Sequence, residues 1–132
     1  MMNLNQNKYM ENSIRTASPT QLLIMLCDGA IRFCKLGMEA IRKKEYIEAG
    51  SHIGKVQNII NEFVLTLDVK SPVADGLLKL YDYLLHRLIE SNIKKDIAII
   101  EEVVQFLVDL KETWISAATA IRQGNTSGAQ HV

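Results

Sequence analysis

Histidines near carboxylates are the residues of this chain that come closest to a catalytic or metal-binding pattern. A di-iron site in a helical protein needs Glu-x-x-His on two helices, with further glutamates facing inward. His52 is preceded three positions earlier by Ala49, and His86 by Tyr83, so neither histidine fits. Asp82 and His86 are four residues apart, which on a helix predicts a surface pair. The histidines therefore indicate neither a metal site nor a catalytic pair.

Cys27 and Cys34 are the two cysteines, and the chain has no Cys-x-x-Cys pair and no phosphate-binding glycine loop. On one helix the two residues would stand about 10 Å apart, which is beyond the Cα separation of a disulfide. We expect both to be reduced packing residues, because a buried thiol behaves as a small hydrophobic group. The chain is predicted not to be an enzyme and to need no metal or cofactor.

Composition limits the partners that the protein can have. With 132 residues, 48% of them hydrophobic, the chain can bury the core of one domain. Its 15 basic and 15 acidic residues balance, which argues against nucleic acid and anionic lipid as partners. The first residues are polar, and no apolar run approaches the roughly 18 residues of a membrane span. We expect a cytoplasmic protein with no nucleic-acid partner and no membrane insertion.

Two prolines, each preceded by a serine, indicate where helices begin. Ser18-Pro19 and Ser71-Pro72 each have the pattern of an N-cap followed by proline at the first helical position. Gln21, three residues after Ser18, can return a hydrogen bond and complete a capping box. These signals predict a first helix from residue 19 and a third from residue 72.

Apolar residues at steps of three and four extend these signals into four helices. We expect helices over residues 19–43, 45–67, 72–92 and 97–123, the last capped by Asp96 and ending before Gly124. Short connections make neighbouring helices antiparallel, so the predicted fold is all-α, an up-down four-helix bundle. The predicted organisation is an arm at 1–17, the bundle domain at 18–123 and a disordered tail at 124–132.

The first and fourth helices carry more apolar surface than one core face requires. Apolar positions cover about 220° of the first helix and about 200° of the fourth. Either both helices are central and covered on two sides, or they border a groove that takes a partner segment. For such a groove the candidate contact residues are Leu23, Cys27 and Ile31 on the first helix and Ile99, Phe106 and Leu110 on the fourth.

The polar arm before the first helix contains a few large apolar residues, Tyr9 and Ile14 among them. Termini that merely fray seldom carry spaced large hydrophobic residues. We therefore expect the arm to cover the groove as a removable lid through Tyr9 and Ile14. Fraying is the alternative.

Three blocks of the sequence carry a family resemblance. The first, from Ser18 to Phe33, contains Ser-Pro-x-Gln-Leu and an Asp-Gly pair, and the second is an aromatic-Asp-aromatic stretch within residues 80–88. The third is Glu101-Glu102-Val103, with a tryptophan near the end of the last helix. Together they resemble the flagellin-specific export chaperones known as FliS. The matched positions are Ser18, Pro19, Gln21, Asp28, Gly29, Tyr81, Asp82, Tyr83, Arg87, Asn92, Asp96 and Trp114.

The resemblance implies a bundle that binds the disordered C-terminal segment of flagellin, prevents its premature polymerisation and delivers it for type III flagellar secretion. It also implies that the arm, in which Tyr9 matches an aromatic position, covers a binding cleft while flagellin is absent. For Tyr81, Asp82 and Tyr83 we favour a structural role in holding helices together. A regulatory adaptor that binds a flagellar regulator or an export component is the alternative function, and pairing with a second copy stays open.

Overall fold

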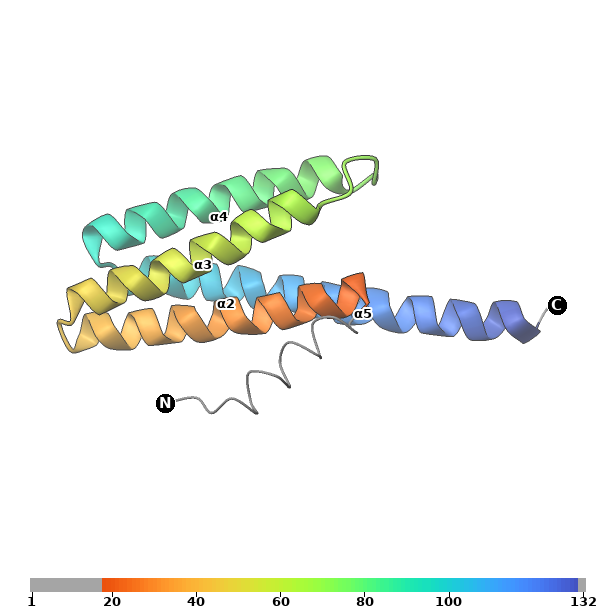
Figure 1. Ribbon diagram of the computed structural model, residues 1–132, viewed down its shortest axis with the longest axis horizontal. Helices are drawn as coiled ribbons and strands as arrows, with labels where there is room; N and C mark the ends of the chain where they lie inside the picture. Colours follow the sequence, from red (N-terminus) through yellow and green to blue (C-terminus); the bar gives the residue numbers. More distant parts are fainter. Residues whose placement is uncertain (1–17, 131–132) are drawn as a thin grey trace, which may run out of the picture.

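The computed structural model describes residues 18–130, and these form four helices (Figure 1). The helices are α2 (Pro19–Arg42), α3 (Tyr46–Thr66), α4 (Ala74–Lys94) and α5 (Ile97–Gln130). Each runs antiparallel to the one before it, and α2 and α4 each pack against both α3 and α5. The predicted all-α up-down four-helix bundle is confirmed. The predicted arm at 1–17, with Tyr9 and Ile14, lies outside the described residues.

Two of the predicted helix caps are present. The Ser18 hydroxyl accepts a hydrogen bond from the Gln21 backbone N–H at 3.2 Å, and the Gln21 side chain accepts one from the Ser18 N–H at 3.0 Å. This capping box starts α2 at Pro19, as predicted. At the other end of the bundle the Asp96 carboxylate accepts from the Ala98 N–H at 2.9 Å, which caps α5.

The predicted start of the third helix at Ser71-Pro72 is wrong, because α4 begins at Ala74. The chain between α3 and α4 forms turns, in which the Asp68 carbonyl accepts from the Ser71 N–H at 3.0 Å. The Ser71 carbonyl in turn accepts from the Ala74 N–H at 3.1 Å, and its hydroxyl from the Val73 N–H at 3.4 Å. Ser71 therefore stabilises the connection and does not cap a helix.

The predicted end of the fourth helix is also wrong, because α5 continues through Gly124 to Gln130. This stretch contains two glycines, Gly124 and Gly128, each of which costs only about 1 kcal/mol relative to alanine, and no proline stops the helix. The C-terminal part of α5 projects beyond the N-terminal end of α2 (Figure 1). One end of the bundle is therefore overhung by a single helix.

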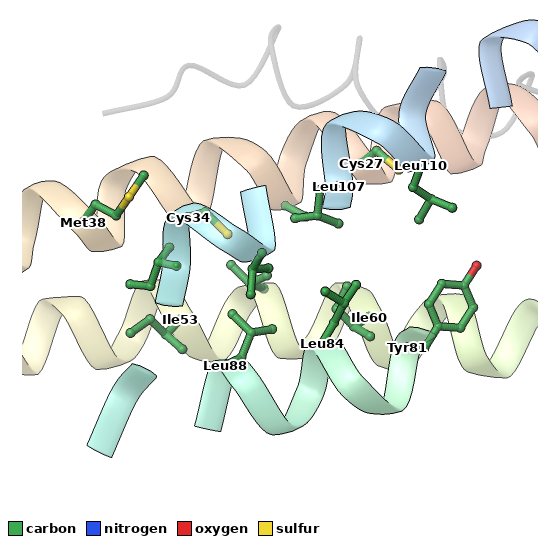
Figure 2. Close-up of a cluster of buried hydrophobic side chains, with 14 of the residues drawn as sticks. Cys27, Cys34, Met38, Ile53, Ile60, Tyr81, Leu84, Leu88, Leu107 and Leu110 are labelled. Atoms are coloured by element: carbon green, nitrogen blue, oxygen red, sulfur yellow. The ribbon is translucent and has the colours of Figure 1, made fainter. Parts of the chain in front are cut away.

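The core lies along the axis of the bundle, where all four helices contribute aliphatic side chains (Figure 2). Ile60 of α3, Leu84 and Leu88 of α4 and Leu107 of α5 are 0% exposed. At the end of the bundle where α5 projects beyond α2, the core contains aromatic as well as aliphatic side chains. There the rings of Phe63 and Tyr81 lie 5.4 Å apart.

Candidate partner-binding surface

The groove predicted between the first and last helices is only partly exposed. Cys27 is 0% exposed, and Ile99 and Leu110 are each 5% exposed, so these three side chains face the interior and line no open groove in this structure. Both α2 and α5 pack against two neighbouring helices, which cover most of their wide apolar arcs. The alternative of two central helices is therefore the right one for these positions.

The other three candidates reach the surface but do not share one face. Phe106 lies on the α4 side of α5, where its ring meets that of Tyr83 edge-on at 5.8 Å. Ile31 is half-buried at the margin of the core. Leu23 is also half-buried, and it lines a hollow at the end of the bundle. Of the six predicted contact residues, Leu23 lines this end hollow.

This end hollow has a volume of about 210 Å³ and lies where the α3–α4 connection meets the start of α2 and the middle of α5. Its walls are mostly apolar. The lining residues are Leu23, Phe63, Thr66, Leu67, Asp68, Ser71, Val73, Leu77, Tyr81 and Trp114. Sequence reasoning missed the contribution of the connection, because it placed Val73 in the apolar stripe of the third helix and treated residues 68–71 only as a turn.

Two aromatic residues of the family motif stand in the wall of the end hollow. Tyr81 is 1% exposed, and burial raises the pKa of its hydroxyl to about 12, with a smaller contribution from nearby Cys27. Trp114 is half-buried, and its indole nitrogen is shielded from solvent without an acceptor among the described residues. The two residues thus place an aromatic hydroxyl and an indole N–H beside the mostly apolar wall of the hollow.

Tyr83 and Arg87 of the motif belong to a polar network that joins α4 to α5. The Tyr83 hydroxyl donates to the Glu102 carboxylate, and the Arg87 guanidinium binds the same carboxylate at 3.2 Å. The hydrogen bond from Tyr83 is the main cause that lowers the pKa of Glu102, and Arg87 lowers it further. Arg87 also bonds Glu90 at 2.7 Å within α4. This arrangement accords with the structural role favoured for Tyr83, and it identifies Glu102 as the partner that sequence reasoning did not name.

Two further motif positions hold helices together. The Asp28 carboxylate forms an ion pair with Lys111 at 2.6 Å, which links α2 to α5. The neighbouring Gly29 faces α3, where an added Cβ would contact the Ile59 side chain at 3.6 Å. Asn92, near the end of α4, bonds the Lys95 side chain. Asp28 and Gly29 thus join α2 to its neighbours, whereas Asn92 bonds within the end of α4.

The remaining ionisable candidates are one surface pair and two buried thiols. Asp82 and His86 form an exposed pair on α4, 3.6 Å apart. Cys27 and Cys34 are free and buried, and burial raises the pKa of each thiol to about 12. Within residues 18–130, no group of three or more His, Cys, Asp or Glu is placed to hold a metal ion. None of the described helices combines the length and apolar composition that crossing a membrane requires.

Comparison with known proteins gives one consistent result. The family model described as flagellar protein FliS matches residues 1–121. The flagellar secretion chaperone FliS of Bacillus subtilis is 32% identical over 115 residues, which cover 87% of this chain and 86% of the relative. The protein of the same name from Salmonella typhimurium is 32% identical over 107 residues, covering 79% of each chain. A crystal structure of a bacterial flagellar chaperone superposes with a TM-score of 0.73 at 23% identity, covering 88% of this chain and 96% of that one, and supports the same fold. The chain belongs to the FliS family of flagellar proteins.

Proposed function

We propose that this protein is a cytoplasmic flagellar export chaperone and not an enzyme. It binds the disordered C-terminal segment of flagellin, prevents premature polymerisation and delivers the segment for type III flagellar secretion. Membership of a family whose relatives are named flagellar secretion chaperones carries the proposal. The partner is a protein segment, and neither nucleic acid nor membrane insertion is part of the function.

The apolar surface at the overhung end supports binding of a flexible segment. Val73 and Ile121 are each 56% exposed, and Val69 is 75% exposed. Exposed apolar side chains at the same end as an apolar hollow are consistent with a partner site. A segment that is disordered when free can follow such a surface, because it has no fold of its own to disrupt.

The N-terminal arm is proposed to cover this surface until the partner arrives. Ser18, where the arm joins α2, is five residues before Leu23 in the wall of the end hollow. The arm therefore joins the bundle beside the apolar end. We expect Tyr9 and Ile14 of the arm to be able to reach this end. The partner would replace the arm, which makes release of the partner easier because the uncovered surface does not stay exposed to water.

Binding of this kind couples to folding of the partner. Such interfaces bury on the order of 1,000–3,000 Å². Part of the free energy gained by this burial offsets the entropy cost of ordering the segment. The contact is largely apolar and involves no covalent or metal bond, so export components can remove the partner. Leu23, Ile31 and Phe106 are the predicted contact residues whose side chains reach the surface, and they stay our candidates.

A calorimetric titration with flagellin from the same organism tests the proposal. We expect intact flagellin to bind with a negative heat-capacity change, and flagellin without its C-terminal segment to give no heat. Equal binding of both forms would contradict the proposed segment. No binding of either form would contradict the proposed partner and favour the regulatory-adaptor alternative.

A charged substitution locates the contact. Leu23→Glu is expected to abolish binding while leaving helicity, measured by circular dichroism, close to that of the wild type. The matched control is Ile47→Glu at the opposite end, where the side chain is 92% exposed. Binding by Leu23→Glu equal to that of the control would remove Leu23 from the contact.

A further inference from the structure

The end hollow combines a mostly apolar wall with a buried donor that lacks a partner among the described residues. Tyr81 is 1% exposed, and its hydroxyl is turned away from Ile60 and Leu84 (Figure 2). Within residues 18–130 the hydroxyl makes no hydrogen bond, whereas the Tyr83 hydroxyl, two residues later, bonds Glu102. The indole N–H of Trp114 has no acceptor either. The indole N–H is therefore a shielded donor that the walls of the hollow do not satisfy, and the phenol hydroxyl has no hydrogen bond among the same residues.

Buried polar groups without partners are rare, because leaving a donor unpaired costs free energy. An unpaired buried indole N–H in the wall of a cavity favours a ligand that supplies a hydrogen-bond acceptor. The volume of about 210 Å³ lies below the roughly 300–1,000 Å³ of small-molecule pockets. A single large side chain with its peptide group fits both requirements, since it fills an apolar space and brings a carbonyl.

The surroundings of the end hollow favour a chain that passes over it. Exposed apolar residues lie on two elements at this end: Val69 and Val73 on the α3–α4 connection, and Ile121 on the overhanging part of α5. A lone side chain would leave these residues in water, whereas a continuous segment covers them as well. The occupant is therefore a peptide segment anchored by one residue.

We propose that the end hollow binds one large apolar residue of the flagellin segment together with its peptide group. The side chain fills the hollow, and the main-chain carbonyl accepts a hydrogen bond from the Trp114 indole N–H. The Tyr81 hydroxyl donates to the neighbouring main-chain carbonyl. Because the indole nitrogen is shielded before binding, the Trp114 ring turns as the residue enters. This inference rests on the proposed function, since it names the anchor point of the same partner.

The chain offers a direct readout, because Trp114 is its only tryptophan. In the full-length ¹⁵N-labelled protein, the single indole N–H resonance is expected to move downfield when intact flagellin is added. Tyr81→Phe and Trp114→Phe each remove one donor and keep an aromatic ring. Each is expected to weaken flagellin binding by about 3- to 10-fold in Kd, the usual effect of losing one hydrogen bond. The matched control is Tyr46→Phe at the far end, which should bind like the wild type.

Thermal stability separates this role from a purely structural one. Tyr81→Phe should keep the wild-type Tm or raise it, because the hydroxyl has no partner to lose in the free protein. A lower Tm with unchanged flagellin binding would overturn the proposal. An indole resonance that moves when residues 1–17 are deleted, but not when flagellin is added, would assign the hollow to the chain's own arm and also overturn it. If wild-type protein gives no heat with flagellin, the proposed function itself fails, which is a different result from equal binding by wild type and Tyr81→Phe.

Discussion

Lys111 of α5 lies 2.6 Å from the carboxylate of Asp28 in α2. The side chains are 32% and 52% exposed, so water and salt screen the pair. Asp28 stands next to Gly29, where α2 approaches Ile59 of α3. One turn of α2 thus contacts both neighbouring helices. Asp28 forms an ion pair with α5, and Gly29, which has no side chain, allows α3 to approach closely. The Asp-Gly pair therefore fixes how α2 sits between α3 and α5.

Removing this ion pair should have a small effect that depends on salt. Asp28→Asn is expected to lower the Tm by about 1–3 °C at low ionic strength, because an exposed pair contributes little to stability. The difference from wild type should shrink in 1 M salt, where charges are screened within about 3 Å. Thermal melts of Asp28→Asn, Lys111→Gln and the double variant measure the coupling. Strictly additive single effects would show that the two residues do not interact.

Core truncation should be far more costly than truncation of the next residue along the helix. Leu88 is 0% exposed, so Leu88→Ala is expected to lower the free energy of unfolding by about 2–5 kcal/mol. Ile89 is 49% exposed, and Ile89→Ala should change it much less. Urea denaturation of both variants tests the difference. Similar losses would mean that Ile89 packs against a surface that the monomer does not show.

Most of the fold was predictable from the sequence because its signals are local. The Ser18–Gln21 capping box needs only residues three apart, and the apolar steps of α3 and α4 need only helical periodicity. The same reasoning failed at Ser71, because the choice between capping a helix and bracing a turn depends on how α3 and α4 are joined. It failed at Gly124 as well, since a glycine is only a weak stop signal.

The candidate site was harder to predict, because exposure is a property of the assembled bundle. Helical periodicity located the apolar arcs of α2 and α5 correctly but could not say how many neighbours cover them. Cys27 and Leu110 are therefore buried, although they lie on the predicted arcs. The end hollow joins Leu23 to Val73 and Trp114, which are far apart in the sequence, and no local pattern links them.

The two serine–proline steps should respond differently to the same substitution. Ser18→Ala removes a helix cap and is expected to lower the free energy of unfolding by about 1 kcal/mol. Ser71→Ala removes only a 3.4 Å hydrogen bond in an exposed turn, so a smaller loss is expected. Chemical denaturation of the two variants measures both values. A larger loss at Ser71 would show that the turn contributes more to stability than the cap.

Neither cysteine should react while the protein is folded. The thiolate is the reactive form, and burial raises the pKa of both Cys27 and Cys34 to about 12. Labelling with a thiol reagent at neutral pH should be slow in buffer and reach both thiols in denaturant. Because these pKa values lie above those of unfolded cysteine, stability is full at neutral pH and falls as the pH rises past about 8.5. Rapid labelling of the native protein would show that α2 opens readily.

The network between α4 and α5 should make stability depend on pH in the acidic range. The hydrogen bond from Tyr83, and then Arg87, holds the pKa of Glu102 below its ordinary range in the folded protein. A carboxyl with a lowered folded pKa contributes stability above its unfolded pKa of about 4.3, and this contribution is lost as the pH falls through the folded pKa. Glu102→Gln should therefore lower the Tm at pH 7 and approach the wild-type Tm near pH 3.

The control for this prediction is Glu101→Gln, one residue earlier on α5, which forms no ion pair among the described residues. Glu90 keeps its own bonds to Arg87 and Lys94 in both variants, so its contribution cancels in the comparison. The Tm difference between the two variants, measured from pH 3 to pH 7, then isolates Glu102. A difference that stays constant over this range would mean that Glu102 joins the helices through packing alone, without its charge.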